Sequence, residues 1–275
     1  MWNCDIARLL ILGRNPRGIA EWLERECGQM GVEIRTATTA VAAIPSKDNA
    51  LEGLECLSVE TGETYVLLCR KLVLAAGPWT PALVKTLFPA STLDLQPSIN
   101  AGDWVVMENK NILDSRSLAV VFFDEIVHEK LEFAGRNDGT VWVCGRRNYS
   151  AELPSPNEVD EPDESVISGL LTYSRRFLNF GQDGKGEGTL HPSVLAQGRS
   201  FRPSTVSGLP FISEIPSRLL FSLEGTHSNS SGVFICYGHG SYGITLGIGS
   251  GKLIAQLVQN EKTDIDISKF KVTLD

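Results

Sequence analysis

The sequence predicts an α/β protein in which an antiparallel domain is inserted into a domain with parallel strands. Two continuous apolar runs, Lys71–Ala76 and Gly232–Tyr237, each end in a glycine-containing turn. Runs of this kind are typical of strands buried on both faces of a parallel sheet. Short β-like runs in close succession lie between them, and such a succession indicates an antiparallel sheet.

The part of the chain before residue 93 is predicted to contain two helices and four strands. Asn15-Pro16 provides a cap and a favourable first helical residue, and Gly31 provides a stop. The second helix is Thr80–Leu87. The predicted strands are Val32–Thr36, Leu54–Glu60, Thr64–Cys69 and Lys71–Ala76, of which the second and third form a hairpin around Thr61-Gly62-Glu63.

The middle of the chain has a different pattern, several short β-like runs followed by one helical segment, and this pattern predicts an α+β domain. Its β-like runs are Trp104–Met107, Leu118–Phe123, Leu131–Ala134 and Val141–Cys144. The acidic, proline-containing segment Glu152–Glu164 predicts an exposed loop, and Glu164–Phe180 has helical periodicity. A glycine-rich connector, Gly181–Gly188, precedes two extended segments, Ala196–Pro203 and Pro210–Ile215.

Composition excludes several classes of protein. The chain has 33 acidic and 25 basic residues, a net charge of −8, which argues against nucleic-acid binding. No run approaches 18 apolar residues, so we expect no membrane span. Six cysteines without CxxC spacing predict neither a zinc site nor a disulfide framework. The N-terminus is a poor signal peptide, so the expected location is the cytoplasm.

The most informative motif is Gly238-His239-Gly240-Ser241-Tyr242-Gly243, which lies between a predicted strand and a predicted helix from about Ile244 to Gln259. Glycines allow close backbone approach, and a helix N-terminus offers N–H groups to an anion or a polar ring edge. The G-x-G-x-x-G spacing lacks the acidic residue on a second strand that a dinucleotide fingerprint requires. A tightly packed strand–helix corner remains an open alternative.

Two further motifs are weak individually. Ala75-Ala76-Gly77-Pro78-Trp79 follows a predicted strand, where ligands bind in open α/β sheets, although a purely structural corner has the same pattern. Ser200-Phe201-Arg202-Pro203 places an arginine beside a rigid proline, where its guanidinium can bind a carboxylate with two hydrogen bonds. A surface or ion-paired arginine is the alternative interpretation.

Taken in order, the motifs resemble the FAD-dependent amino-acid oxidases, a family that includes D-amino-acid, glycine and sarcosine oxidases, and more narrowly its fungal branch. The resemblance covers residues 15–275 and depends on NPRGIAEWLERECGQMGVEI, KLVLAAGPWTPAL, GRNDGTVWVCGRRN, SFRPSTVSGLPFI and GHGSYGITLGIGSGKLIAQL. It implies an FAD/NAD(P)-binding-type domain in two parts, residues 1–92 and 196–275, with an inserted substrate domain at 93–195.

The resemblance also implies a reaction, a set of contacts and a location. A carbon beside an amine gives hydride to the flavin, which oxygen reoxidises. Arg202 is expected to hold the substrate carboxylate. Endosomes are a second expected location. The expected cofactor contacts are Val41, Ala75, Ala76, Gly77, Trp79, Gly238, His239, Gly240, Ser241, Gly243, Ile244 and Thr245.

Two departures from the family pattern, and the absence of a cysteine that members with covalent flavin use, qualify these expectations. Ser200-Phe201-Arg202 contains no cysteine for a covalent flavin, so FAD is expected to bind non-covalently. Ser207 replaces the usual aspartate of RPxTxDGxP. The chain also lacks an N-terminal G-x-G-x-x-G, which leaves two interpretations open: an FAD-dependent oxidoreductase, or an inactive remnant that acts as a binding protein. Without the strand, glycine turn and helix that carry this motif in the family, apolar faces of the neighbouring strands would be exposed, which predicts poor solubility of the isolated chain.

Overall fold

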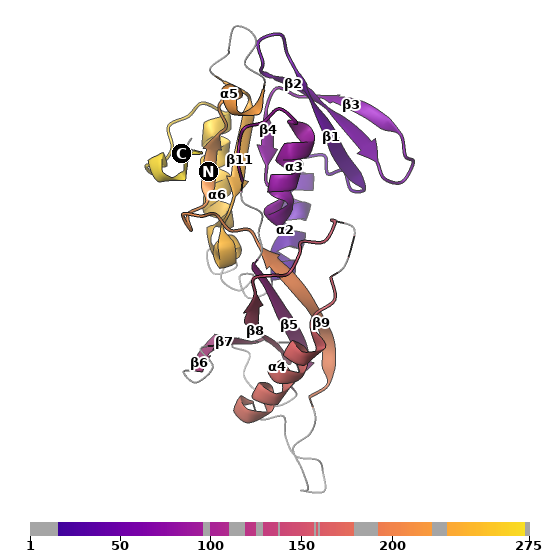
Figure 1. The fold of residues 1–275 in the computed structure, drawn as a ribbon, viewed down its shortest axis with the longest axis vertical. Coiled ribbons are helices and arrows are strands. Elements are labelled where there is room, and N and C mark those ends of the chain that lie inside the picture. The colour runs from indigo at the N-terminus through magenta and orange to yellow at the C-terminus, as the bar shows by residue number, and fades with distance from the viewer. Residues whose placement is uncertain are drawn as a thin grey trace, which may run out of the picture. The chain divides into compact units, whose positions relative to one another are not determined.

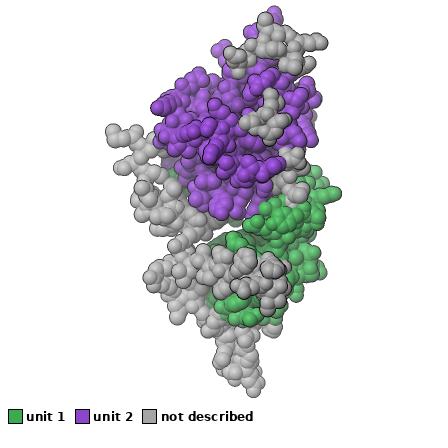
Figure 2. Space-filling model, turned by 60° about the vertical axis from the view of Figure 1, so that its left-hand side comes forward, with its two compact units in different colours: residues 1–23, 99–201 green, residues 24–98, 202–275 purple. Residues whose placement is uncertain are grey.

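The computed structural model describes residues 16–95, 100–109, 119–124, 129–136, 138–156, 158, 160–178, 192–221 and 230–272 (Figure 1). The chain divides into two compact units, which Figure 2 shows in different colours. One unit takes residues 1–23 and 99–201, and the other takes residues 24–98 and 202–275.

The second unit is built on a three-stranded sheet in the order β10-β11-β4. β11 (Val233–Tyr237) pairs in parallel with β4 (Leu72–Leu74), with Leu74 opposite Ile235, and antiparallel with β10 (Phe211–Glu214). A short helix, α5 (Ser217–Leu220), follows β10. The parallel pairing of the two apolar runs is therefore confirmed.

Helices and a second sheet cover the two faces of this sheet. Phe234 and Ile212 pack on one face against Leu253 and Ile254 of α6 (Gly243–Val258). The opposite face contributes Leu74 and Ile235 to a core shared with α3 (Thr80–Leu87) and with the antiparallel sheet β1-β2-β3. These strands span Thr38–Pro45, Leu51–Ser58 and Thr64–Leu68. The hairpin and the helix predicted here are confirmed.

The first unit contains a five-stranded sheet in the order β6-β7-β8-β5-β9. The strands are β5 (Asn100–Glu108), β6 (Ala119–Asp124), β7 (Glu129–Gly135), β8 (Thr140–Asn148) and β9 (Val194–Arg202). α4 (Glu164–Phe177) covers one face, where Ile167 and Leu170 meet Val105, Leu131 and Val143. The four β-like runs and the helix are confirmed, while the connector at 181–188 lies outside the described residues.

Two expectations about strands are wrong. Residues 32–36 form no strand, because α2 (Pro16–Gln29) ends at Gly31 with φ +84° and the exposed chain only begins to pair with β2 at Thr38. Val73 is not buried on both faces: it is 41% exposed, on the face of the sheet where α6 packs against Ile212 and Phe234. The first unit contains residues 194–201 of β9, and the last residue of this strand, Arg202, belongs to the second unit.

A buried ion pair ties the acidic loop to the five-stranded sheet. Arg199 on β9 donates to both carboxylate oxygens of Asp103 on β5, at 2.6 and 3.1 Å, and to Asp160 at 3.0 Å. The Arg199 and Asp103 side chains are 11% and 3% exposed. Asp103 also accepts from the backbone N–H of Asp163, whose carboxylate caps α4 at Ser165 and Val166. One arginine thus fixes both the loop and the start of the helix.

Replacing Arg199 with methionine should destabilise this unit by about 3–5 kcal/mol, because the substitution leaves the Asp103 carboxylate buried without its counter-charge. Urea unfolding followed by fluorescence of Trp104 and Trp142 measures the effect. Arg17→Met is the matched control: Arg17 pairs with Glu21 at 2.7 Å, but the two side chains are 87% and 58% exposed, so little change is expected. Equal midpoints for the two variants would contradict the assigned role of Arg199.

Candidate functional site

Two glycine-containing turns leave the parallel strand pair at the same edge. β4 ends at Leu74 and leads through Ala75 and Ala76 into a 3-10 turn, Gly77–Trp79, before α3. β11 ends at Tyr237 and leads through Gly238 and His239 into a second 3-10 turn, Gly240–Tyr242, before α6. Because the strands are parallel and adjacent, both turns lie at their carboxyl ends, where open α/β sheets bind ligands.

Glycine is required at both turns by the backbone conformation. Gly77 and Gly240 have φ of +55° and +56°, values that L side chains rarely adopt. No atom lies within 4 Å of the position that a Cβ would take at either residue. The structure therefore leaves open backbone at both turns, which a ligand can approach closely.

The second turn is packed against the residues that follow the predicted arginine. Gly240 N–H donates to Pro203 O at 2.7 Å, and the Tyr237 hydroxyl donates to Ser204 O at 3.1 Å. A Cβ on Gly238, whose φ is +90°, would lie 2.2 Å from Cγ2 of Thr205. Two motifs that are more than thirty residues apart in the sequence are thus one packed structure, which we call the Pro203–Gly240 junction (residues 203–205 and 237–240).

The loop after Thr205 is closed by hydroxyl groups. Thr205 Oγ1 donates to Leu209 O at 2.6 Å, and Leu209 N–H donates to Ser207 Oγ at 3.3 Å. Gly208 completes the turn with φ +71°. Ser207, where the family pattern has aspartate, still accepts the backbone hydrogen bond that an Asx-type turn needs.

His239 points towards α6. Its Nε2 lies 2.9 Å from Oγ of Ser250, which is 3% exposed. Burial lowers the pKa of the His239 imidazole below its usual value, so the ring is neutral at pH 7 and one nitrogen remains an acceptor. Desolvation also raises the pKa of Tyr237 to about 12, which keeps its hydroxyl a donor to Ser204 O.

The first half of α6 is accessible to solvent. Ser241, Gly243, Ile244 and Thr245 are exposed, and the first buried residue after Gly238 is Ser250. The first N–H groups of a helix have no partner within the helix and carry its positive dipole end. The Gly240 N–H is used by Pro203 O, so the groups available to a ligand are those at the start of α6.

The remaining predicted residues occupy separate positions. Ala75 is exposed, and Ala76, Gly77 and Trp79 are half-buried at the first turn. Arg202 is half-buried at the end of β9, directly before the junction. Val41 lies within β1, at the irregularity between Ala40 and Ala42, and not after a preceding strand as expected.

Sequence reasoning missed the residues that fix the second turn. They are Pro203, Ser204, Thr205, Tyr237 and Ser250. Only the proximity of Pro203–Thr205 to Arg202 in the sequence could have drawn attention to them. No spacing in the sequence links them to Gly238, because the pairing arises from tertiary packing.

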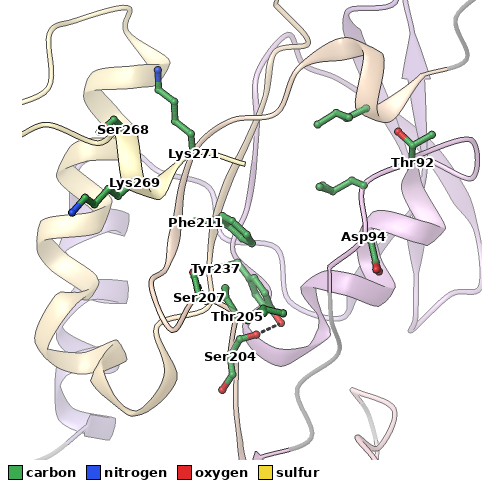
Figure 3. A pocket seen from close by; sticks show the side chains of 13 residues that line it. Thr92, Asp94, Ser204, Thr205, Ser207, Phe211, Tyr237, Ser268, Lys269 and Lys271 are labelled. Atoms are coloured by element: carbon green, nitrogen blue, oxygen red, sulfur yellow. Dashed lines mark hydrogen bonds between the residues drawn. The ribbon is translucent and has the colours of Figure 1, made fainter. Parts of the chain in front are cut away.

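A cavity of about 520 Å³ lies beside the junction within the second unit (Figure 3). Figure 3 shows the Tyr237 hydroxyl directed at Ser204, with Phe211 above it and Thr92 and Asp94 on the opposite wall. The cavity takes in none of the predicted cofactor contacts. Its lining therefore includes Ser204, Thr205 and Tyr237 of the junction and none of the residues of the two open glycine turns.

Two kinds of feature are absent from the part of the chain that the structure describes. No group of three or more His, Cys, Asp and Glu residues there is placed to hold a metal ion. No helix in the same residues is long and apolar enough to cross a membrane.

These features define an α/β protein with an antiparallel insertion and a glycine-lined sheet edge of the type that binds nucleotide cofactors. The family described as FAD dependent oxidoreductase matches residues 13–257. The chain belongs to this family, whose cofactor is FAD. The predicted α/β fold class is confirmed.

Curated relatives and solved structures agree with this assignment. The chain is 25% identical over 195 residues to "Putative oxidoreductase C1F5.03c" of Schizosaccharomyces pombe, covering 68% of this chain and 41% of that protein. It is 24% identical over 200 residues to an aerobic glycerol-3-phosphate dehydrogenase of Staphylococcus epidermidis, and the match covers 71% of this chain and 34% of that protein. The chain thus spans less than half of the length of these relatives.

A structural match gives the same fold. The glycine oxidase of Geobacillus kaustophilus superposes with a TM-score of 0.59 at 19% identity, covering 86% of this chain and 52% of that chain. At this identity the similarity establishes the fold alone.

Substituting Gly238 with alanine should destabilise the junction strongly. The left-handed backbone costs about 1–2 kcal/mol for a residue with Cβ, and the contact with Thr205 adds a steric cost. Thr205→Ser removes Cγ2 and keeps the hydroxyl, so the double variant Gly238→Ala/Thr205→Ser should recover the steric part. Thermal unfolding compares the variants. Gly243→Ala, at φ −54° in open space, is the control and should be tolerated. Failure of Thr205→Ser to restore any stability would refute the close contact.

Proposed function

We propose that the protein is an FAD-dependent oxidoreductase that oxidises a C–N bond of an amino acid or amine. The observation that carries the proposal is the pair of open glycine turns at one edge of the parallel strands, in a chain of this family. When bound, FAD supplies the chemistry by accepting hydride from the carbon beside the nitrogen, with oxygen as the proposed reoxidant.

The residues at the sheet edge fit the flavin end of FAD. Gly77 and Gly240 leave space where side chains would stand, and the start of α6 presents exposed N–H groups that favour negative charge. We assign the ring and its ribityl chain to Gly238–Thr245, and the nucleotide crevice to Ala75–Gly77 with Trp79 beside it. Val41 is proposed for the adenine end. Binding is proposed to be non-covalent.

The proposed substrate contact is Arg202. It ends β9 and directly precedes the junction, so the packing of Pro203 against Gly240 fixes the backbone next to it. A guanidinium that forms two hydrogen bonds with a carboxylate orients the substrate, and orientation is the main contribution the protein makes to hydride transfer. The proposed partner is therefore a small amino acid or amine, and the proposed location is the cytoplasm.

The first test is the visible absorption spectrum of the purified chain after incubation with FAD and removal of free cofactor. Flavin absorbance that stays with the protein and is released by acid is expected for non-covalent binding. Peroxide formation is then screened with glycine, sarcosine and D-amino acids, with glycerol 3-phosphate as the alternative substrate. A chain that retains no flavin would refute the proposal and favour the interpretation as a binding protein without catalysis.

Replacing Arg202 with methionine should lower kcat/KM for a carboxylate substrate. A hydrogen bond to a charged group contributes about 1.5–3 kcal/mol, which corresponds to about 10- to 150-fold in rate. Steady-state peroxide assays measure the effect, and an amine without a carboxylate is the internal control that should be affected least. Equal losses for both substrates would exclude carboxylate binding by Arg202. Arg17→Met, which removes an exposed arginine, is the control and should leave kcat/KM unchanged.

A further inference from the structure

We propose that His239 is a positioning residue, whose hydrogen bond to Ser250 holds the Gly238–Tyr242 turn and the glycine-rich first half of α6 in one conformation. This inference rests on the proposed function in one respect: the turn that His239 holds is the one assigned to the flavin. The contact itself belongs to the chain and can be measured without cofactor.

The first half of α6 is intrinsically a weak helix. Gly243, Gly247 and Gly249 lie in it, and each glycine lowers helix stability relative to alanine. Side chains give little tertiary support, since Ile244, Leu246 and Ile248 are 50%, 41% and 44% exposed. No atom lies within 4 Å of a Cβ at any of these glycines. The segment therefore needs an anchor at its beginning.

His239 supplies that anchor by bridging the exposed segment. Ser250 is the first buried residue after Gly238, and the buried part of α6 continues with Leu253 and Ile254. The 2.9 Å contact between His239 Nε2 and Ser250 Oγ joins the turn directly to this point, eleven residues further along the chain. The weak segment is therefore tied at both ends to the packed part of the unit.

The side chain of His239 has no equivalent within the turn. Ser241 and Tyr242 are exposed, Tyr242 by 65%, and the other described bonds of the turn use its backbone. These are Gly240 N–H to Pro203 O and Tyr242 N–H to His239 O. Glycine backbone loses more conformational entropy on ordering than any other residue, so a side-chain anchor matters most in such a turn.

The chemistry of the contact suits a permanent structural role. The Ser250 hydroxyl is buried, and buried hydroxyls need a hydrogen-bond partner. Desolvation keeps the imidazole neutral at pH 7, so the bond joins two neutral groups and buries no charge. A neutral hydrogen bond contributes about 0.5–1.5 kcal/mol, which corresponds to a factor of about 2 to 13 in a local opening equilibrium.

The test is amide hydrogen exchange on the full chain without cofactor. His239→Ala and Ser250→Ala should each accelerate exchange of the hydrogen-bonded amides of Gly240, Tyr242 and residues 247–250 by about 2- to 13-fold. The double variant should match the single variants, because both remove the same bond. His239→Gln, which retains a polar group of similar reach, should restore most of the protection. Gln256→Ala, also on α6, is the control. It removes the 2.9 Å hydrogen bond from Gln256 to Asp264, which lies after the helix, and should leave exchange of these amides unchanged.

FAD titration of the same proteins gives the second measurement. Loss of affinity by a similar factor in His239→Ala and Ser250→Ala, with rescue by His239→Gln, is the expected result. Unchanged exchange in His239→Ala, or the same acceleration in Gln256→Ala, would overturn the inference. Wild-type protein that binds no FAD would instead refute the proposed function, while the exchange data would still decide whether His239 fixes the turn.

Discussion

The packing of the Gly238 turn against Pro203–Thr205 is the constraint on which the organisation of the second unit depends. It joins the end of β11 to the segment that directly follows Arg202, and it leaves no room for any side chain at Gly238. The main-chain bond from Gly240 to Pro203 and the bond from Tyr237 to Ser204 hold the same two segments. A single close approach thus fixes both the direction of α6 and the backbone beside Arg202.

The open positions at this edge are backbone groups, and the neighbouring side chains mainly set where the backbone lies. Positive φ at Gly77 and Gly240 exposes main chain, and α6 presents its first N–H groups to solvent. His239, Thr205 and Tyr237 are directed towards the protein and not towards the open turns. The open edge is therefore formed by main chain, and its position depends on packing within the second unit.

The two units hold their loops and turns in place with different kinds of interaction. In the five-stranded sheet, a buried ion pair from Arg199 to Asp103 and Asp160 holds a polar loop that has little apolar area to bury. In the other unit, neutral hydrogen bonds and glycine contacts hold the turns.

The sequence by itself determined the fold class, most strands and helices, and the two turns, because apolar periodicity and glycine placement are local signals. It failed at residues 32–36, where an alternating pattern has no partner strand, and at Val73, where an apolar residue in a predicted buried strand is 41% exposed. Only the tertiary structure decided that Thr205 meets Gly238, that His239 reaches Ser250 and that Arg199, three residues before Arg202, is the arginine in the buried ion pair. Contacts between distant segments depend on how strands pair and layers pack, and no local pattern encodes that.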